Sequence, residues 1–208
     1  MSCKCHVPVV LRDDNAGHEI TIRGFMIMLQ LSLQALQRLA EFDARLFLGI
    51  NRLHRHLPLE KLVRGISFTG DGHFYVVLAI VLPLLYPKEG LDFLMAGLFS
   101  FLLELPLYWL LKRSFKRRRP FHVVQALAPL LKPSDEFSFP SGHTTAAFMM
   151  AALVGVFFPA ALFPMLLWAS LIGLSRVMLR VHFISDVLAG IVLGTTIAML
   201  SLLILGYL

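Results

Sequence analysis

The last third of the chain places all of its charged chemistry in one short stretch. Over residues 144–208 the only basic, acidic or histidine residues are Arg176, Arg180, His182 and Asp186, within SRVMLRVHFISD. Histidine can attack phosphorus as a nucleophile or transfer protons near neutral pH. If a helix starts here, His182 and Asp186 share one face, and the carboxylate can keep one ring nitrogen protonated while the other attacks. A satisfied intramembrane polar pair explains the same spacing, and the spacing alone favours neither interpretation.

Two other polar clusters could complete a site for an anion. KRSFKRRRP contains Lys112 and Arg119, which together with Arg176 make three cations. Arginine can pair two phosphoryl oxygens at once through its fork of N–H groups. In PSGH, Ser141 and Gly142 come just before an expected helix, whose free backbone N–H groups and dipole favour an anion. Each arginine taken alone is better explained as an interface anchor, so the phosphate site depends on the clusters sharing one membrane face.

The composition indicates an integral membrane protein. The chain has 208 residues, 57% of them hydrophobic and only 15% charged, with a mean hydropathy of +0.74. Soluble domains are about one quarter charged, so a soluble helical core would leave too little polar surface. The net charge of +6 would allow nucleic-acid binding, but in a membrane protein a basic excess more often marks the membrane face or an anionic substrate, and we expect no nucleic-acid partner. Cys3 and Cys5 predict two thiols in a tail rather than a zinc site or a disulfide framework.

The apolar segments predict an all-α bundle of about five to six membrane helices as the fold class. Five apolar windows have the length of short or full membrane spans: residues 70–87, 91–111, 144–158, 160–179 and 184–207. Residues 25–57 form an amphipathic segment that either lies in the interface or crosses the membrane. Residues 1–24 are predicted as a polar tail without a signal peptide, residues 25–208 as one membrane-embedded domain, and residues 112–143 as its active-site loop.

Three connections are predicted from local composition. HRHLPLEKLVRG, from residue 54 to residue 65, is typical of a solvated basic connector. PKEG at residues 87–90 indicates a turn between two spans. Residues 123–131 predict a short helix within the active-site loop.

Counting membrane crossings brings the polar clusters together. The span at residues 91–111 ends where the loop begins and the next span starts where the loop ends, so both ends of the loop lie on one face. The hairpin FFPAALFP turns on the other face, and the span at residues 160–179 returns to the first. The segments Lys112–Arg119, Pro140–His143 and Arg176–Asp186 therefore converge on one membrane face.

The three clusters carry a resemblance to a known family. KRSFKRRRP fits K-x6-R-P, PSGH is intact, and SRVMLRVHFISD fits S-R-x5-H-x3-D. In this order and spacing they resemble the three motifs of the type 2 phosphatidic acid phosphatase family. That family includes membrane lipid phosphatases, polyprenyl diphosphate phosphatases and glucose-6-phosphatase, and it shares its core and site with vanadium haloperoxidases and related acid phosphatases. The motifs cover residues 112–186, whereas the first 70 residues carry none.

The resemblance implies a role for each matching residue. His182 would be the nucleophile that forms a phosphohistidine, Asp186 would orient and stabilise it, and His143 would protonate the leaving oxygen and then activate water. The residues that would hold the phosphoryl oxygens are Lys112, Arg119, Ser141, Gly142 and Arg176. Fixed side chains could supply the charge that phosphoryl transfer needs. We therefore expect no cofactor and no metal, because the sequence has no dense carboxylate cluster beyond the pair Asp135 and Glu136.

The remaining charged residues near the motifs have plainer interpretations. Four lie between the ends of the first motif and are expected to form a basic patch at the interface: Arg113, Lys116, Arg117 and Arg118. Arg180 is given an interface role, with help in holding the substrate as the alternative. It is the residue of its cluster whose removal we expect to matter least.

Two features inside the apolar spans also call for an explanation. Glu104, Tyr108 and Lys112 fall on one helical stripe, with Glu104 roughly 12 Å below Lys112. Glu104 is expected to face the bundle and pair with a polar group there, with contact to substrate as the alternative. Gly190 and Gly194 form a G-x-x-x-G pattern that favours close helix packing within the bundle over a dimer face.

The predicted function is hydrolysis of a lipid phosphomonoester or diphosphate, with the lipid less determined than the reaction. Undecaprenyl diphosphate, phosphatidic acid and phosphatidylglycerol phosphate are the candidates, and the oligomeric state is left open. The alternatives are a lipid phosphotransferase using the same phosphohistidine and a non-enzymatic lipid-phosphate binding or transport protein; a haloperoxidase is opposed by the spans. Most of the 19 lysines and arginines lie on the expected active face, which points to the cytoplasm. The resemblance to bacterial members points instead to the periplasmic face of the inner membrane, and we adopt that expectation.

Overall fold

The computed structural model describes residues 30, 34, 37–52, 59–124, 128–133 and 135–208. The chain divides into two compact units, Met1–Phe42 and Asp43–Leu208. In the first unit the described residues are helical, and the predicted polar tail of residues 1–24 lies outside the described residues. The second unit contains all three motifs, and within it residues 43–52 are helical.

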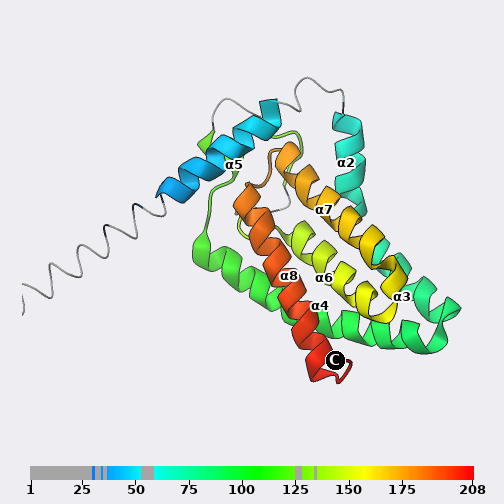
Figure 1. Ribbon diagram of the computed structural model, residues 1–208. Coiled ribbons are helices and arrows are strands. Elements are labelled where there is room, and N and C mark those ends of the chain that lie inside the picture. The colour runs from blue at the N-terminus through cyan, green and yellow to red at the C-terminus, as the bar shows by residue number, and fades with distance from the viewer. Residues whose placement is uncertain (1–29, 31–33, 35–36, 53–58, 125–127, 134) are drawn as a thin grey trace, which may run out of the picture. The chain divides into compact units, whose positions relative to one another are not determined.

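The second unit is built from helices, and its described residues contain no strand. The elements are α2 (Glu60–Thr69), α3 (His73–Leu85), α4 (Pro87–Phe115), α5 (Pro120–Val123), α6 (Gly142–Phe157), a 3₁₀ turn (Pro159–Ala161), α7 (Leu162–Met178) and α8 (Ile184–Ile204), as Figure 1 shows. The prediction of an all-α fold is therefore confirmed.

Three segments of the described chain are long and apolar enough to cross a membrane: Pro87–Val123, Pro159–Met178 and Ile184–Ile204. Helices α2 and α3, bent by 49° at their junction, become a fourth if they count as one broken span. The predicted span at residues 144–158 corresponds to α6, which has only 16 residues and is buried among the other helices. Large apolar side chains such as Leu102 of α4, Phe163 of α7 and Val192 of α8 point outward, as a lipid-facing surface requires.

Several boundaries differ from the sequence prediction. PKEG is the first turn of α4 rather than a separate turn, because proline suits the first helical position and Glu89 favours the helix N-terminus. Helix α4 also continues four residues past the predicted end, so that Lys112 belongs to it. The basic connector ends early, because α2 begins at Glu60. The short loop helix is α5 at residues 120–123 rather than at residues 123–131, and residues 125–127 lie outside the described residues.

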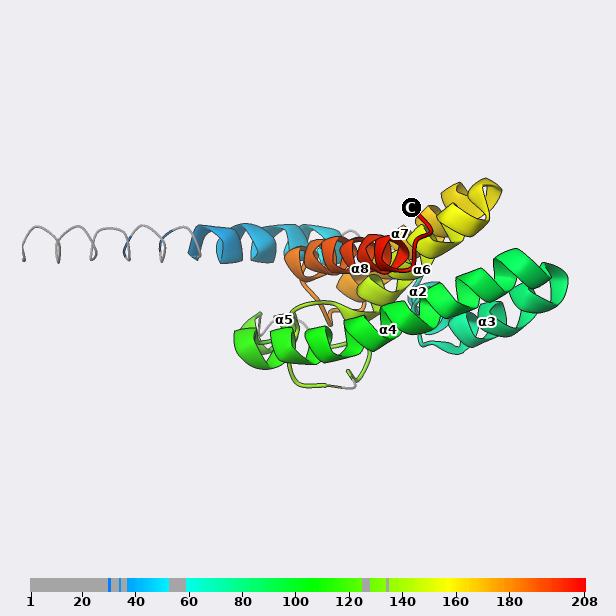
Figure 2. The ribbon, with the colours of Figure 1, turned by 90° about the horizontal axis from the view of Figure 1, so that it is seen from below.

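Helix α6 lies at the centre of the bundle and packs on α4, α7 and α8 (Figure 2). The approach of α8 is close because a Cβ on Gly190 would lie 2.8 Å from the carbonyl oxygen of Ser141, and one on Gly194 would lie 2.2 Å from that of Thr145. The prediction that these glycines serve packing inside the bundle is confirmed. The same contact sets the start of α6 beside the start of α8, where the Ser141 N–H donates to the carbonyl oxygen of Asp186 at 3.0 Å.

Candidate active site

The three motif segments meet where four helices end or begin. Lys112 lies in the last turn of α4 and Arg176 in the last turn of α7. His143 is the second residue of α6. His182 precedes α8, and Asp186 lies in the first turn of that helix. Backbone hydrogen bonds join the segments directly: the Ser141 N–H donates to the Asp186 carbonyl oxygen and the His182 N–H to that of Arg176.

Two of the three predicted cations share one carboxylate. Lys112 Nζ lies 2.5 Å from Asp135 Oδ1, and an Arg119 guanidinium N–H donates to the same oxygen at 2.6 Å. Arg119 also donates to the carbonyl oxygen of Val181 at 2.7 Å, which fixes it against the turn before α8. Burial on its own raises the pKa of Asp135, but the hydrogen bonds and charges of Lys112 and Arg119 outweigh burial and lower that pKa below its ordinary value. Asp135 is therefore ionised at neutral pH and holds both cations in place.

The third predicted cation, Arg176, has one N–H group that makes no hydrogen bond within the described residues. Arg176 is 3% exposed, and one of its terminal N–H groups donates to Ser67 Oγ at 2.7 Å. Its Nε is buried and has no hydrogen-bond partner within the described part of the chain. A buried donor without a partner is costly, so this N–H is available to an anionic ligand.

His182 is buried and held by a backbone carbonyl. Its Nδ1 lies 2.7 Å from the carbonyl oxygen of Ser138. A carbonyl oxygen only accepts hydrogen bonds, so Nδ1 carries the proton and Nε2 keeps its lone pair. Burial lowers the pKa of His182 to about 4, although Asp186 opposes the shift. The imidazole is therefore neutral at pH 7 and can act as a nucleophile through Nε2.

Asp186 does not orient His182 in the way the spacing suggested. His182 precedes α8 rather than lying on it, and Asp186 Oδ2 is 3.8 Å from Nδ1, beyond hydrogen-bond distance. That oxygen instead accepts the backbone N–H of Phe183 at 2.8 Å and so caps the start of α8. The Ser138 carbonyl fixes the tautomer of His182, and Asp186 contributes a nearby negative charge.

Arg117, which the sequence predicts to belong to the interface patch, connects the site to the helix at residues 43–52. Arg117 pairs with Asp186 Oδ1 at 2.6 Å and with Asp43 Oδ2 at 2.6 Å. Ser185 donates its hydroxyl to the Asp43 carboxylate and accepts from Arg117 at 2.5 Å. The backbone carbonyl of Arg117 also accepts from the N–H of Ser138 at 2.9 Å. Arg117 therefore holds in place both Ser138, whose carbonyl oxygen contacts His182, and Asp186, whose carboxylate lies near His182. This role corrects the prediction that Arg117 belongs to an interface patch.

The second histidine has an acidic partner from another helix junction. His143 Nε2 lies 2.5 Å from Asp71 Oδ1, and Asp71 comes from the turn between α2 and α3. Because a carboxylate accepts, Nε2 carries a proton and Nδ1 remains for a ligand. Asp71 was not found from the sequence, where only the glycine-rich segment TGDGH marks its position.

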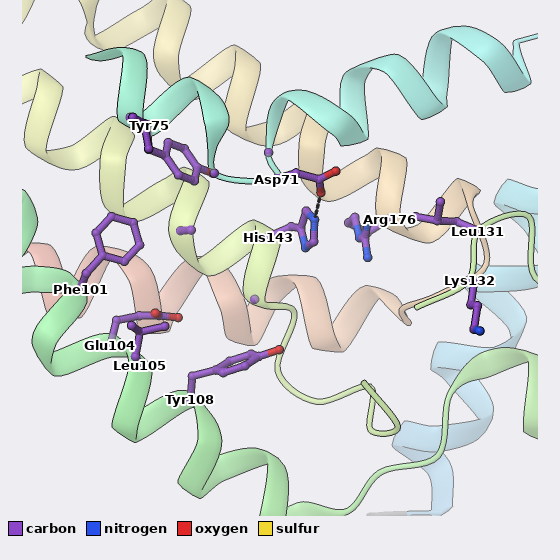
Figure 3. Close-up of a pocket in the computed structure, with 15 residues that line it drawn as sticks. Asp71, Tyr75, Phe101, Glu104, Leu105, Tyr108, Leu131, Lys132, His143 and Arg176 are labelled. Carbon is purple, nitrogen blue, oxygen red and sulfur yellow. Dashed lines mark hydrogen bonds and ion pairs between the residues drawn. The ribbon is translucent and has the colours of Figure 1, made fainter. Parts of the chain in front are cut away.

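A cavity of about 670 Å³ opens beside His143 and Arg176 (Figure 3). Gly142, at the start of α6, also lines it, next to the ring of Tyr108. The amide groups in the first turn of α6 have no intrahelical acceptor, and that of Ser141 is already used by Asp186. The anion-binding role predicted for the start of α6 would then depend on Gly142 and the residues after it.

Arg180 lies in the turn before α8, outside the group of contacts around His182. Its backbone has φ +66°, in the left-handed region, and its side chain donates to the carbonyl oxygen of Ala128 at 3.0 Å and to Asn51 Oδ1 at 3.3 Å. These contacts connect the turn to the loop and to the helix at residues 43–52. They differ from the interface role expected for this residue.

The described residues contain no group of three or more histidine, cysteine, aspartate or glutamate side chains placed to hold a metal ion. The carboxylates near the site are instead engaged by cations: Asp135 by Lys112 and Arg119, and Asp186 by Arg117.

A known family model matches the part of the chain that contains this site. Residues 93–208, more than half of the chain, match the family model described as the PAP2 superfamily. The chain belongs to this superfamily. The match includes all eight residues predicted for the site, and the resemblance found in the three motifs is confirmed.

Two relatives of this chain are named as phosphatases. The chain is 33% identical over 139 residues to decaprenylphosphoryl-5-phosphoribose phosphatase of Mycobacterium tuberculosis, covering 64% of this chain and 73% of the relative. It is 32% identical over 151 residues to phosphatidylglycerophosphatase B of Bacillus subtilis, covering 65% and 70%.

Two solved structures share the fold. LpxE of Aquifex aeolicus superposes with a TM-score of 0.67 at 29% identity, over 76% of this chain and 93% of that one. The transmembrane PAP2-type phosphatidylglycerolphosphate phosphatase of Bacillus subtilis gives a TM-score of 0.62 at 28% identity, over 88% and 92%. These likenesses place the present chain among integral membrane proteins of this fold.

Proposed function

We propose that this protein is a membrane-embedded lipid phosphatase that works through a phosphohistidine on His182. The observation that carries the proposal is the state of that residue: a buried, neutral imidazole whose Nδ1–H is held by a carbonyl oxygen. Three buried cations, Lys112, Arg119 and Arg176, belong to the same motif set. A neutral nucleophile beside fixed positive charge suits attack on an anionic phosphate.

The first chemical step forms a bond from His182 Nε2 to phosphorus and breaks the bond from phosphorus to the leaving oxygen. In its doubly protonated form, His143 gives the Nδ1 proton to that oxygen and keeps its Nε2–H hydrogen-bonded to Asp71; burial lowers the pKa of His143, and the Asp71 carboxylate opposes that shift. His182 gains positive charge as it is phosphorylated, and the carboxylate of Asp186 at 3.8 Å stabilises that charge.

The second step reverses these roles. Neutral His143 takes a proton from water, the water oxygen attacks phosphorus, and the bond from phosphorus to Nε2 breaks. Inorganic phosphate leaves, and His182 returns to its neutral form. Lys112, Arg119, Gly142 and Arg176 hold the phosphoryl oxygens through both steps, and Ser141 positions the start of α6 beside Asp186.

The proposal includes metal independence, because buried side chains supply the positive charge that phosphoryl transfer needs. We expect purified protein in lipid vesicles to release inorganic phosphate from a lipid phosphate at the same rate with and without EDTA. Loss of activity on chelation, restored by magnesium, would contradict a metal-free reaction.

Transfer of the phosphoryl group to a second lipid without free phosphate would favour a phosphotransferase, and binding without turnover would favour a transport or binding protein.

The proposed substrates are lipids whose phosphate lies at the membrane interface. Undecaprenyl diphosphate, phosphatidic acid and phosphatidylglycerol phosphate are the candidates. The named activities of the relatives, on a decaprenylphosphoryl phosphoribose and on a phosphatidylglycerophosphate, support a phosphorylated lipid in general. Phosphate release from each candidate lipid, measured beside an inactive variant as blank, ranks them.

We further propose that the protein resides in a bacterial inner membrane with its active site on the periplasmic face. The bacterial sources of its relatives support the membrane, whereas the basic active face argues for the cytoplasmic side. Lys132 is exposed and lines the cavity, so it reports on the side of the site. With Cys3 and Cys5 replaced by serine, Lys132→Cys should react with a membrane-impermeant maleimide in intact cells whose outer membrane has been made permeable. Reaction only after lysis would place the site in the cytoplasm.

A further inference from the structure

The cavity beside His143 is where the leaving group of the substrate must lie, given the proposed phosphatase reaction. In phosphoryl transfer the attacking and leaving atoms are roughly in line through phosphorus. His182, the attacking group, is not among the described residues that line the cavity, whereas His143, the group that protonates the leaving oxygen, is. The part of the lipid attached to that oxygen therefore extends into the cavity.

Glu104 is an acid in the wall of this cavity. It is 3% exposed and projects from α4 into the same space as Tyr108 and His143 (Figure 3). No ion pair or hydrogen bond joins its side chain to another residue in the described portion of the chain. A buried polar group without a hydrogen-bond partner costs free energy whether it is ionised or neutral. A ligand group that hydrogen-bonds to Glu104 would offset that cost.

Tyr75 supplies a second unused polar group in the same wall. It projects from α3, lines the cavity and is 7% exposed. Its hydroxyl is buried and has no hydrogen-bond partner among the described residues. The neighbouring wall is apolar, with Val76, Phe101 and Leu105. Glu104 and Tyr75 therefore place two polar groups without described partners in a wall that is otherwise lined by apolar side chains.

The chemistry of this pair narrows the ligand group. A hydroxyl group both donates and accepts, so it can satisfy a carboxyl group and a tyrosine hydroxyl together. A second phosphate, as in a diphosphate, would bring negative charge to a buried carboxyl group and would repel it whenever that group is ionised. In phosphatidic acid the other two hydroxyls of the glycerol are esterified, so the leaving group offers no free hydroxyl. It would leave the Glu104 carboxyl group and the Tyr75 hydroxyl unpaired.

We propose that Glu104, supported by Tyr75, binds a hydroxyl group of the leaving group and selects phosphomonoesters of hydroxylated headgroups, such as a polyol or a sugar joined to a lipid. The proposal rests on the phosphatase function above and extends it to the substrate class. Glu104 is thus a specificity residue, and Lys112, on the same helix, remains a phosphate ligand.

The test compares two substrates that differ only in one hydroxyl. Phosphatidylglycerol phosphate carries a free hydroxyl on the glycerol that bears the terminal phosphate, and its 1,3-propanediol analogue lacks it. In wild-type protein we expect kcat/KM to favour the hydroxylated lipid about 10-fold, the value of one well-formed buried hydrogen bond. Glu104→Ala should abolish this preference, with less than a 2-fold effect on the analogue. Tyr75→Phe should reduce the preference in part.

Matched controls come from the same two regions of the chain. Glu89→Ala changes an exposed acid on α4, and Tyr86→Phe changes a half-exposed tyrosine just before it, so both should leave the preference intact. Equal losses on both substrates in Glu104→Ala, or an unchanged preference, would overturn the proposed hydroxyl site. The same lipids are also compared for binding to His182→Ala protein, alone and with Glu104→Ala. If wild-type protein releases no phosphate but binding still prefers the hydroxylated lipid in a way that depends on Glu104, the phosphatase function is overturned and the hydroxyl site is retained. If neither binding nor turnover prefers the hydroxylated lipid, the hydroxyl site is overturned.

Discussion

Replacement of His182 by alanine is expected to lower phosphate release from lipid by about 10⁴-fold or more, the loss typical of removing a covalent nucleophile. The reason is that the described part of the site offers no second imidazole with the same properties: His143 is committed to Asp71 and faces the cavity. His182 is neutral at pH 7 because burial lowers its pKa to about 4, so it needs no further base to attack. The measurement is kcat on a vesicle-embedded lipid phosphate.

A trapping experiment distinguishes a lost nucleophile from a lost fold. Brief reaction of wild-type protein with a ³²P-labelled substrate and alkaline denaturation should leave acid-labile label on the chain, and the His182→Ala protein should carry none. His122→Ala provides the matched control, because His122 is an exposed histidine in the same active-site loop. Label that persists in His182→Ala would assign the covalent step to a different residue.

The meeting of the three motifs could be predicted because it depends only on the order of spans and motifs. Each span reverses the direction of the chain, so Lys112, His143 and Asp186 had to reach one membrane face. The packing of Gly190 and Gly194 was equally visible, since small residues one turn apart allow two helices to approach.

The support around His182 could not be predicted, because it comes from backbone groups and from distant segments. The partner of Nδ1 is the backbone carbonyl oxygen of Ser138 in the loop. Every residue has such a group, so the residue type does not indicate this contact. Arg117 looks like one of several arginines in a basic run. Lys116 ends α4 in a left-handed conformation with φ +44°, so the residues after it leave the helical stripe and Arg117 turns toward Asp43 and Asp186. An apolar pattern carries no information on such a turn.

The pairing of His143 with Asp71 was missed for a related reason. The two residues are 72 positions apart and lie on different helix junctions. The glycine-rich segment around Asp71 was interpreted only as the start of a span. The chain bends by 49° between α2 and α3, and Asp71 lies at this junction, in contact with His143.

Replacement of His143 by alanine is expected to separate the two chemical steps. With a lipid phosphate the leaving oxygen is strongly basic and needs a proton, so kcat should fall by about 10²–10⁴-fold. With p-nitrophenyl phosphate the leaving phenolate is stable without a proton, so phosphorylation of His182 should continue. Water activation would still be missing, and the phosphohistidine should accumulate as a burst of one nitrophenolate per chain followed by slow turnover.

The partner of His143 gives this prediction its control. Asp71→Asn keeps the size of the side chain but removes the negative charge of the carboxylate, whose Oδ1 lies 2.5 Å from His143 Nε2 and accepts its N–H. It should lower kcat on the lipid by less than His143→Ala, without a burst on p-nitrophenyl phosphate, because Nδ1 still reaches both the leaving oxygen and the water. Equal losses on both substrates in His143→Ala, with no burst, would mean that His143 holds the phosphoryl group in place and transfers no proton. The leaving-group dependence of that one variant therefore decides whether the pair of histidines divides the reaction as the geometry around Asp71 and Ser138 implies.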